Sequence, residues 1–479
     1  MNKAVKIVPL LLGPFVGLLV LYLLSRTVEA EDSQIEPAFY SLAIGAWMAV
    51  WWIAEAVPLA VTALIPLFFF PFLSVRPLTA VIGSYAHPLI FLFLGGFIIS
   101  LALQKWSLDR RFAIVIVNLI GREPKRLVAG VMLATAILSM WISNTATSIM
   151  MLPIALSLIS SNRSGPSFNY AVLLAVAYGA SIGGIATIIG TPPNTFVASY
   201  LKDVLAEEIG FVEWMAFGLP LATFFLLTAW AYLVFFRYPF ERTAATDSEP
   251  LLPPASPMSF PHFATLLVFG LVALGWLTRR WLNGIVIRDT QPLAPLTDAH
   301  IAMGGAICLF LLPALGTSFK RVLAPADLIK VPWGTLILFG GGLALSSTIK
   351  ATGADAIIGG WVSALPALPS WLVLATVVAF VVAVTELTSN IATTATLVPI
   401  LAASAQILGV DVVTLVVATA FSASCAFMLP VATPPNAIVY GSGQLPADQM
   451  ARSGFLLNII ATLLISLSMY SLFPYFRSF

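Results

Sequence analysis

The sequence contains few charged residues, cysteines or histidines. Only 9% of its 479 residues are Asp, Glu, Lys or Arg, and the net charge is +2. A typical soluble domain carries about 25% charged residues. This composition excludes a soluble enzyme, a nucleic-acid binder and a disordered chain. The two cysteines, Cys308 and Cys425, form neither a disulfide framework nor a metal-ligand pattern, and the three scattered histidines argue against a metal or triad enzyme.

Long hydrophobic runs predict an all-α polytopic membrane protein. Hydrophobic residues make up 59% of the chain, and a helix needs about 20 mostly apolar residues to cross a bilayer. The first run resembles a signal peptide, but residues 26–34 lack a convincing cleavage pattern, so we expect a retained helix. The expected spans lie near residues 8–24, 40–55, 57–74, 86–104, 169–200, 214–236, 260–277, 300–317, 334–350, 411–440 and 453–474.

The basic residues predict the orientation, because Lys and Arg accumulate in cytoplasmic loops. With the N-terminus inside, most of the basic residues fall in cytoplasmic loops. The largest cluster is Lys105, Arg110, Arg111, Arg122, Lys125 and Arg126. An odd number of spans then places the C-terminus outside. Because large loops are absent, we expect a bacterial inner-membrane (plasma membrane) protein.

The two halves of the chain contain the same motifs in the same order. The paired segments are SNTATSIMMLP from Ser143 and SNIATTATLVP from Ser389, glycines 95–96 and 341–342, and GTPPN at 190–194 and ATPPN at 432–436. The first two pairs are 246 residues apart and the third is 242 apart. This agreement indicates a duplication.

The span count indicates that the second copy is inverted in the membrane. We expect an N-terminal helix and outer loop (1–39), a first repeat (40–236), a proline-rich cytoplasmic linker (237–259) and a second repeat (260–479). Each repeat has five crossings, an odd number, so the copies have opposite orientations. Inverted repeats are typical of secondary transporters, with the binding site where the copies meet. A channel could also be built this way, but interrupted helices favour a carrier.

Two further apolar stretches, 127–162 and 371–408, have a polar centre. Each arm has about 16 residues, or roughly 24 Å of helix. Hydropathy does not separate two full spans from a re-entrant hairpin. The hairpin is favoured because a polar tip in lipid must line a cavity or be buried. We therefore expect about eleven transmembrane helices plus two re-entrant hairpins.

The polar tips predict an anion site. Ser143-Asn144 and Ser389-Asn390 are good N-caps for the arm that follows. The N–H groups and the positive dipole end of each arm would then point at the middle of the membrane and hold an anion. Capping of a turn is the simpler interpretation of one tip, but two tips from inverted repeats would converge on one site.

The TPPN motifs predict a complementary cation site. Prolines 192–193 and 434–435 cannot donate an N–H, so helical carbonyls four residues earlier lose their partners. These carbonyls belong to Ile188, Ile189, Pro430 and Val431. Unpaired carbonyls at membrane depth are costly unless they coordinate something. Sodium would suit them, although a proline kink for packing is the alternative.

Neutral oxygen ligands favour sodium over protons as the coupling ion. Proton carriers place Asp, Glu or His in the pathway. Here the only acid near a motif is Glu386, and we expect the other intramembrane acid, Glu55, to be structural. No Lys or Arg lies in either motif. A bound anion would therefore depend on helix ends and co-bound cations for neutralisation, which would couple the two.

The paired Ser-Asn-Thr tips and Pro-Pro-Asn breaks resemble the divalent anion/sodium symporters, the INDY-like dicarboxylate and citrate carriers. The resemblance covers nearly the whole chain. It implies a homodimeric elevator-type carrier, with a scaffold domain (40–122 and 260–352) and a transport domain (123–236 and 353–479). It also implies at least two sodium sites, a small divalent anion as substrate, in particular a C4-dicarboxylate such as succinate, malate or fumarate, and no nucleic acid partner.

The resemblance also implies the ligands. The first sodium site would use Ser139, Ser143, Asn144 and the backbone at Gly190, and the second Thr385, Thr388, Asn390 and the backbone at Ala432. The substrate would contact Ser143, Asn144, Thr145, Thr191, Pro192, Ser389, Asn390, Ile391, Thr433 and Pro434. Ile391 departs from the family pattern, which has threonine there, and its pocket lacks that hydroxyl. A sodium-independent dicarboxylate exchanger and a citrate or sulfate carrier of the same fold are the alternatives. A membrane-embedded hydrolase would need a base, and no histidine is near either serine in the sequence.

Overall fold

The computed structural model describes residues 7–27, 35–121, 123–161, 165–239, 257–287, 289–317, 320–363 and 368–474. Over these residues the fold is helical, and β-structure is confined to two isolated bridges. Arg122 and most of the expected linker 237–259, including Pro250, lie outside the described residues.

The helices of the first half begin with α1 (Ile7–Thr27), α2 (Glu36–Ala54), α3 (Leu59–Thr62), α4 (Ile65–Phe72), α5 (Leu78–Tyr85) and α6 (Pro88–Lys105). They continue with α7 (Leu108–Ile120), α8 (Pro124–Ser139), α9 (Asn144–Ser161), α10 (Pro166–Gly184), α11 (Pro192–Val204), α12 (Phe211–Ala231) and η1 (Tyr232–Arg237). The second half begins with α13 (Phe260–Asn283), α14 (Asp298–Leu311), η2 (Pro325–Lys330), α15 (Trp333–Ala351) and α16 (Ala354–Val362). It ends with α17 (Ser370–Thr385), α18 (Asn390–Ser404), α19 (Val412–Ala423), α20 (Pro434–Tyr440) and α21 (Ala447–Ser471).

Eight helices of the described chain are long and apolar enough to cross a membrane. Seven of them coincide with the predicted spans at 8–24, 40–55, 86–104, 214–236, 260–277, 334–350 and 453–474, and the eighth, α10, covers the first part of 169–200. The polytopic all-α prediction is therefore confirmed.

Two predicted spans are interrupted at the predicted Pro-Pro-Asn breaks, and the predicted extents of two others are wrong. Span 169–200 unwinds between α10 and α11, and span 411–440 between α19 and α20, because the paired prolines start a new helix. Span 57–74 consists of the short helices α3 and α4. Span 300–317 ends at Leu311, two residues before Pro313, because a residue preceding proline disfavours the helical conformation.

Two helices, α7 and α16, were not predicted, although they begin 246 residues apart, at Leu108 and Ala354. The residues of α7 form a markedly amphipathic helix. Each of these helices precedes one of the predicted hairpins, α8–α9 or α17–α18. The repeat spacing therefore extends to elements outside the motifs.

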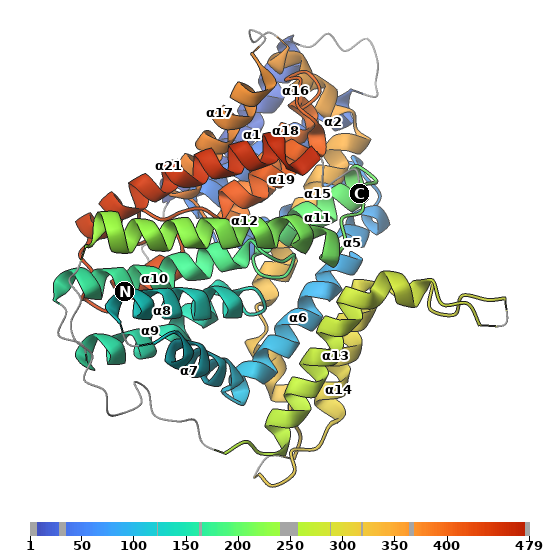
Figure 1. Ribbon diagram of the computed structural model, residues 1–479. Coiled ribbons are helices and arrows are strands. Elements are labelled where there is room, and N and C mark those ends of the chain that lie inside the picture. Colours follow the sequence, from blue (N-terminus) through green and yellow to red (C-terminus); the bar gives the residue numbers. More distant parts are fainter. Residues whose placement is uncertain are drawn as a thin grey trace.

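The two hairpins lie on opposite sides of a central layer. Figure 1 shows α10, α12 and α21 crossing the molecule between α8–α9 and α17–α18, and these neighbours pack together. A second group contains α6, α13 and α14, with α15 packed against α5 and α3. The tips of the hairpins and the broken helices α10/α11 and α19/α20 meet where the two groups adjoin.

The duplication is visible in the packing of the second group. A Cβ atom added to Gly95 would lie 2.7 Å from Ala302, and one added to Gly341 would lie 2.6 Å from the Cβ of Ala63. The two glycines are 246 residues apart, and each permits close helix contact with the other half. The expected repeat is therefore present in the contacts as well as in the sequence.

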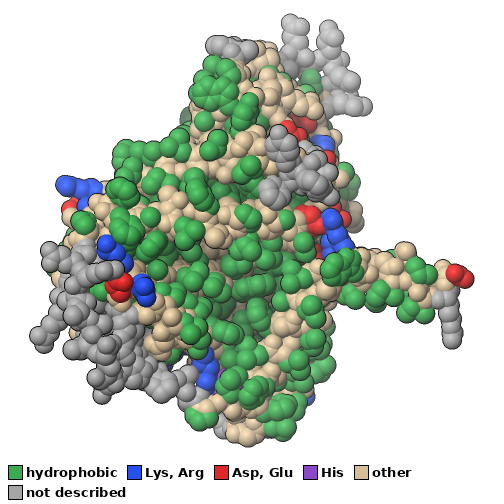
Figure 2. All heavy atoms as spheres, in the orientation of Figure 1, with side chains coloured by type: hydrophobic (Ala, Val, Ile, Leu, Met, Phe, Trp, Pro, Cys, Tyr) green, Lys and Arg blue, Asp and Glu red, His purple; other side chains and the backbone are tan. Residues whose placement is uncertain are grey.

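The surface suits a lipid environment. Figure 2 shows a broad hydrophobic face with charged side chains in a few small groups. On α13, Phe263, Leu267, Leu271 and Leu274 are exposed at helical spacing, and much of α1 is exposed as well. Such faces are stable where lipid covers them.

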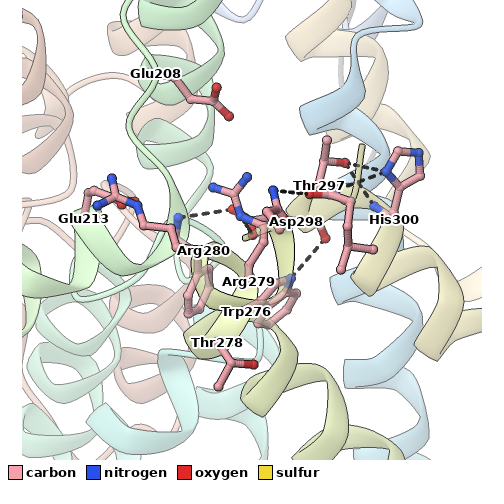
Figure 3. Close-up of polar contacts among 12 residues, drawn as sticks. Glu208, Glu213, Trp276, Thr278, Arg279, Arg280, Thr297, Asp298 and His300 are labelled. Carbon is pink, nitrogen blue, oxygen red and sulfur yellow. Dashed lines mark hydrogen bonds and ion pairs between the residues drawn. The ribbon is translucent and has the colours of Figure 1, made fainter. Parts of the chain in front are cut away.

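Ion pairs join the start of α12 to α13 and α14 (Figure 3). Arg280 pairs with Glu213, and Arg279 Nε lies 2.8 Å from Asp298 Oδ1. The backbone N–H of Phe211 donates to Asp298 Oδ2 at 3.3 Å. These contacts tie together the two groups of helices on one side of the molecule.

Candidate functional site

A cavity of about 900 Å³ lies where both repeats meet. It is lined by all ten residues predicted to contact the substrate, five from each repeat. Its charged lining residues are Glu55, which ends α2, and Lys330, and both are exposed. The structural role of Glu55 stays a prediction. The convergence of the two motifs is confirmed, whereas ligand binding at these residues is a prediction.

Four helices begin at this cavity. The first residues of α9, α11, α18 and α20 are Asn144, Pro192, Asn390 and Pro434, and all four line it. The first N–H groups of α9 and α18 lie at this end, whereas α11 and α20 begin with two prolines that have no N–H. All four helices carry the positive end of their dipole here. The cavity therefore offers positive potential without a lysine or arginine deep inside.

In the first repeat, oxygen atoms surround the side chain of Asn144. Ser139 Oγ lies 2.6 Å from Asn144 Oδ1 and 2.7 Å from the carbonyl oxygen of Ala180. Turned by 180°, the Asn144 amide donates instead, to the Ala180 carbonyl at 3.3 Å and the Gly190 carbonyl at 3.2 Å. With its oxygen inward, Asn144 completes a cluster of four oxygens, an arrangement suited to a small hard cation.

The second repeat has the same arrangement. Thr385 Oγ1 lies 2.9 Å from Asn390 Oδ1 and donates to the carbonyl of Ala423 at 2.7 Å. Ser139 and Thr385 are fully buried behind the cavity wall and orient the two asparagines. Thr388 lines the cavity, but its hydroxyl bonds to Val384 O at 3.0 Å and to the Thr393 hydroxyl at 2.5 Å.

The predicted N-caps are only half present. The N–H of Ala146 donates to Ser143 Oγ at 3.4 Å, which caps α9. Ser389 precedes α18 in an extended conformation without a side-chain cap, so the prediction is wrong there. The Ser389 hydroxyl therefore faces a cavity without capping its own helix.

The prediction that prolines free the carbonyls is also wrong. Pro192–Pro193 and Pro434–Pro435 are the first two residues of α11 and α20, where proline removes no helical hydrogen bond. The carbonyl of Ile188 accepts from Thr195 Oγ1 at 2.6 Å. The unwound segments are held by their asparagines: Asn194 Nδ2 donates to carbonyls of Gly184, Ile185 and Thr187, and Asn436 Nδ2 to those of Ala426 and Leu429.

Glu386 is buried at the end of α17 and lies outside the cavity lining. Its carboxylate accepts from the N–H groups of Phe427, Met428 and Leu429 at 2.6, 2.9 and 3.1 Å, and from Asn458 Nδ2 at 2.7 Å. Sequence reasoning found this acid but not its partners. It also missed the carbonyls of Ala180 and Ala423, because a backbone oxygen leaves no signal in residue type.

The cavity opens at one end of α6. Gln104, near the last residue of α6, lines it, as do Pro332 and Thr335 at the start of α15. At the opposite end of α6, about 27 Å away, His87 Nε2 lies 2.8 Å from Asp203 at the end of α11. Lys350 Nζ contacts the Val204 carbonyl on the same side.

The sequence matches the family described as "Sodium:sulfate symporter transmembrane region" over residues 16–475. The chain belongs to this family. Two relatives from Staphylococcus saprophyticus and Staphylococcus aureus, each named sodium-dependent dicarboxylate transporter SdcS, are 35% identical to it. The alignments cover 98% and 99% of this chain and 92% and 94% of the relatives. The resemblance drawn from the motifs is confirmed, and family membership places the chain among transporters, not enzymes.

Solved structures share the fold. The Alcanivorax borkumensis YdaH transporter superposes with a TM-score of 0.62 at 14% identity and covers 98% of each chain. Neisseria gonorrhoeae MtrF gives a TM-score of 0.60 at 12% identity, over 94% of this chain and 98% of that one. At this identity the likeness concerns the architecture alone.

Proposed function

We propose that this protein is a sodium-coupled symporter of small divalent anions, with C4-dicarboxylates such as succinate, malate and fumarate as its substrates. The observation that carries the proposal is the meeting of four helix N-termini and two equivalent oxygen clusters at one cavity. The names of the Staphylococcus relatives support the same substrate and ion.

The two clusters serve as sodium sites. Ser139, Ser143, Asn144 and Gly190 hold one ion, and Thr385, Thr388, Asn390 and Ala432 hold the other. Since the hydroxyl of Thr388 is engaged by Thr393, that residue contributes through its backbone. Each ion brings positive charge to a hairpin tip, next to the helix ends that face one carboxylate of the substrate.

This arrangement explains coupling. The ten predicted substrate residues contain no cationic side chain, and helix ends alone supply about half a charge each. Because helix dipoles are partial charges that fall off within the first turn, a dianion is bound well only after sodium has added full positive charge at the hairpin tips. Symport follows, because neither partner binds tightly alone.

Transport proceeds by an elevator motion of residues 123–236 and 353–479 against a scaffold of 40–122 and 260–352. The amphipathic α7 and the equivalent α16 connect the two parts. The basic cluster that includes Lys105 supports a cytoplasmic position for this end of the cavity, and with that orientation the conformation is inward-facing. The contacts of Asp203 with His87 and of Glu213 with Arg280 then close the outer side.

The protein works as a homodimer in the bacterial inner membrane, with its N-terminus inside and its C-terminus outside. Lipid covers its exposed apolar faces, among them that of α13.

Uptake of labelled succinate into proteoliposomes, with and without an inward sodium gradient, tests the function. Uptake only with sodium supports symport. Uptake without sodium that is stimulated by internal succinate identifies an exchanger and refutes symport. No uptake under either condition refutes the dicarboxylate assignment, and competition with citrate and sulfate then identifies the anion.

A further inference from the structure

The two unwound segments are held in different ways. In the first repeat, Gly184 and Gly190 bring the ends of the 185–191 segment into backbone contact, and a Cβ on Gly190 would lie 3.0 Å from the Cα of Gly184. The residues 242 positions later are Ala426 and Ala432. Their methyl groups do not allow this approach, so the 424–433 segment needs another support.

Glu386 supplies that support. Its carboxylate binds three consecutive N–H groups, those of Phe427, Met428 and Leu429. Three N–H groups that point at one place require an acceptor, because a buried N–H group without a hydrogen-bond partner costs free energy. Asn458 on α21 donates to the same oxygen, Oε1, which ties α17, the unwound segment and α21 together.

The first repeat uses the reverse arrangement. Met140, 246 residues before Glu386, has an apolar side chain, and its backbone carbonyl accepts from Thr187 Oγ1 at 2.6 Å. Leu429, 242 residues after Thr187, donates to Glu386 through its backbone. The same junction is therefore made once by a side-chain donor and once by a side-chain acceptor.

We propose that Glu386 is a positioning residue that preforms the second sodium site and makes the two sites unequal. This inference rests on the proposed function. Glu386 follows Thr385, whose hydroxyl binds Asn390, and it fixes the segment that leads to Ala432. Its carboxylate accepts hydrogen bonds from four donors, and the residue is outside the cavity lining.

Glu386→Gln tests the role, because the amide keeps the shape but turns an N–H toward a backbone N–H. We expect the sodium concentration for half-maximal uptake to rise about tenfold, the effect of one lost charge-assisted hydrogen bond. The KM for succinate at saturating sodium should change less than about twofold. The matched control is Glu36→Gln, which changes an exposed carboxylate at the start of α2. It should change neither the sodium constant nor the KM for succinate.

Hydrogen exchange gives a readout that does not depend on sodium. In Glu386→Gln the amides of 427–429 should exchange faster, while those of 185–191 should not change. Asn458→Ala removes one donor and keeps the charge, so it should shift the sodium constant less and in the same direction. It also decides the question if Glu386→Gln does not fold.

Equal rises in the sodium and succinate constants, or unchanged exchange at 427–429, overturn the inference. A wild-type protein whose uptake ignores sodium refutes the proposed symport instead. In that case the exchange measurement still decides whether Glu386 holds the segment.

Discussion

Replacing Gly184 with alanine adds one methyl group beside the Asn144 amide. The new Cβ would lie 2.8 Å from Asn144 Oδ1, 3.2 Å from its Nδ2 and 3.3 Å from the carbonyl oxygen of Gly190. Ordinary van der Waals contact begins near 3.4 Å, so the amide must move by about 0.6 Å. The movement disturbs the contacts of the amide with Ser139 and with the Gly190 carbonyl.

The expected cost falls on sodium binding. Losing one hydrogen bond of this kind costs about 1–1.5 kcal/mol, which raises the sodium concentration for half-maximal uptake about tenfold. Stability should change little, because the nearest atoms that the new methyl group meets belong to the side-chain amide of Asn144, which can rotate aside.

The neighbouring Gly183→Ala is the contrasting variant. Its Cβ would meet the backbone of Ala136, with the carbonyl carbon 2.7 Å away, and backbone atoms cannot rotate aside. Helices α8 and α10 must separate, which costs about 1–3 kcal/mol or more. Gly270→Ala, where a Cβ has nothing within 4 Å, is the control for a harmless substitution.

The assay combines sodium-dependent succinate uptake with thermal unfolding in detergent. Gly184→Ala should unfold like wild type and need more sodium, whereas Gly183→Ala should unfold at a lower temperature. A folded Gly184→Ala variant with wild-type sodium dependence would show that Asn144 does not bind sodium at this place.

Further predictions concern other parts of the molecule. Asn144→Ala and Asn390→Ala should each weaken sodium dependence in uptake assays, and normal sodium affinity in both would mean that the sites are misplaced. Ile391→Thr adds a hydroxyl to the cavity and should change the order of preferred anions in competition assays more than it changes sodium affinity. Glu213→Gln breaks the ion pair with Arg280. In a background with Thr145→Cys and Cys308→Ser, this change should increase labelling of the cysteine at position 145 by a thiol reagent added from the outer side. Unchanged labelling would exclude a role of the ion pair in closing the outer side. Burial raises the pKa of Asp327, but the Ala324 N–H, Lys105 and Lys330 outweigh it and leave the pKa below its ordinary value. A lowered carboxyl pKa stabilises the folded state above the unfolded value of about 3.9. Asp327→Asn should therefore lower the melting temperature at pH 7, and the difference from wild type should disappear as the pH falls through the lowered pKa of Asp327; a difference that persists there would contradict this.

Much of the architecture could be predicted because lipid imposes a simple rule on sequence. Apolar runs such as 260–277 identified helices, and the repeat spacing brought Asn144 and Asn390 to one cavity. The breaks at 192 and 434 were also placed correctly, but their chemistry was not, because proline at the start of a helix and proline inside one look alike in sequence. Backbone ligands such as the Ala180 carbonyl depend on how α10 packs against α8, which residue types do not encode.

The partners of Glu386 were hidden for a related reason. An acid at the end of an apolar run suggests charge chemistry, whereas this carboxylate binds the backbone of a segment about forty residues away. In the sequence, the replacement of Gly184 and Gly190 by Ala426 and Ala432 hints that the second segment needs another support. This hint can be interpreted only once the structure shows that the two unwound segments are equivalent.

The unequal support of the two segments has an evolutionary consequence. A duplicated gene begins with interchangeable halves, but here the first half closes its segment with glycines and the second with a carboxylate. A protein assembled from two copies of the first half would have neither Glu386 nor Asn458 in its second copy, although glycines would return. One built from two second halves would have alanines at both junctions. Each half thus supports its own segment, because Glu386, Asn458 and the N–H groups of 427–429 all belong to the second half, as the two glycines belong to the first. Later substitutions in one half are therefore constrained by the kind of support that this half has kept.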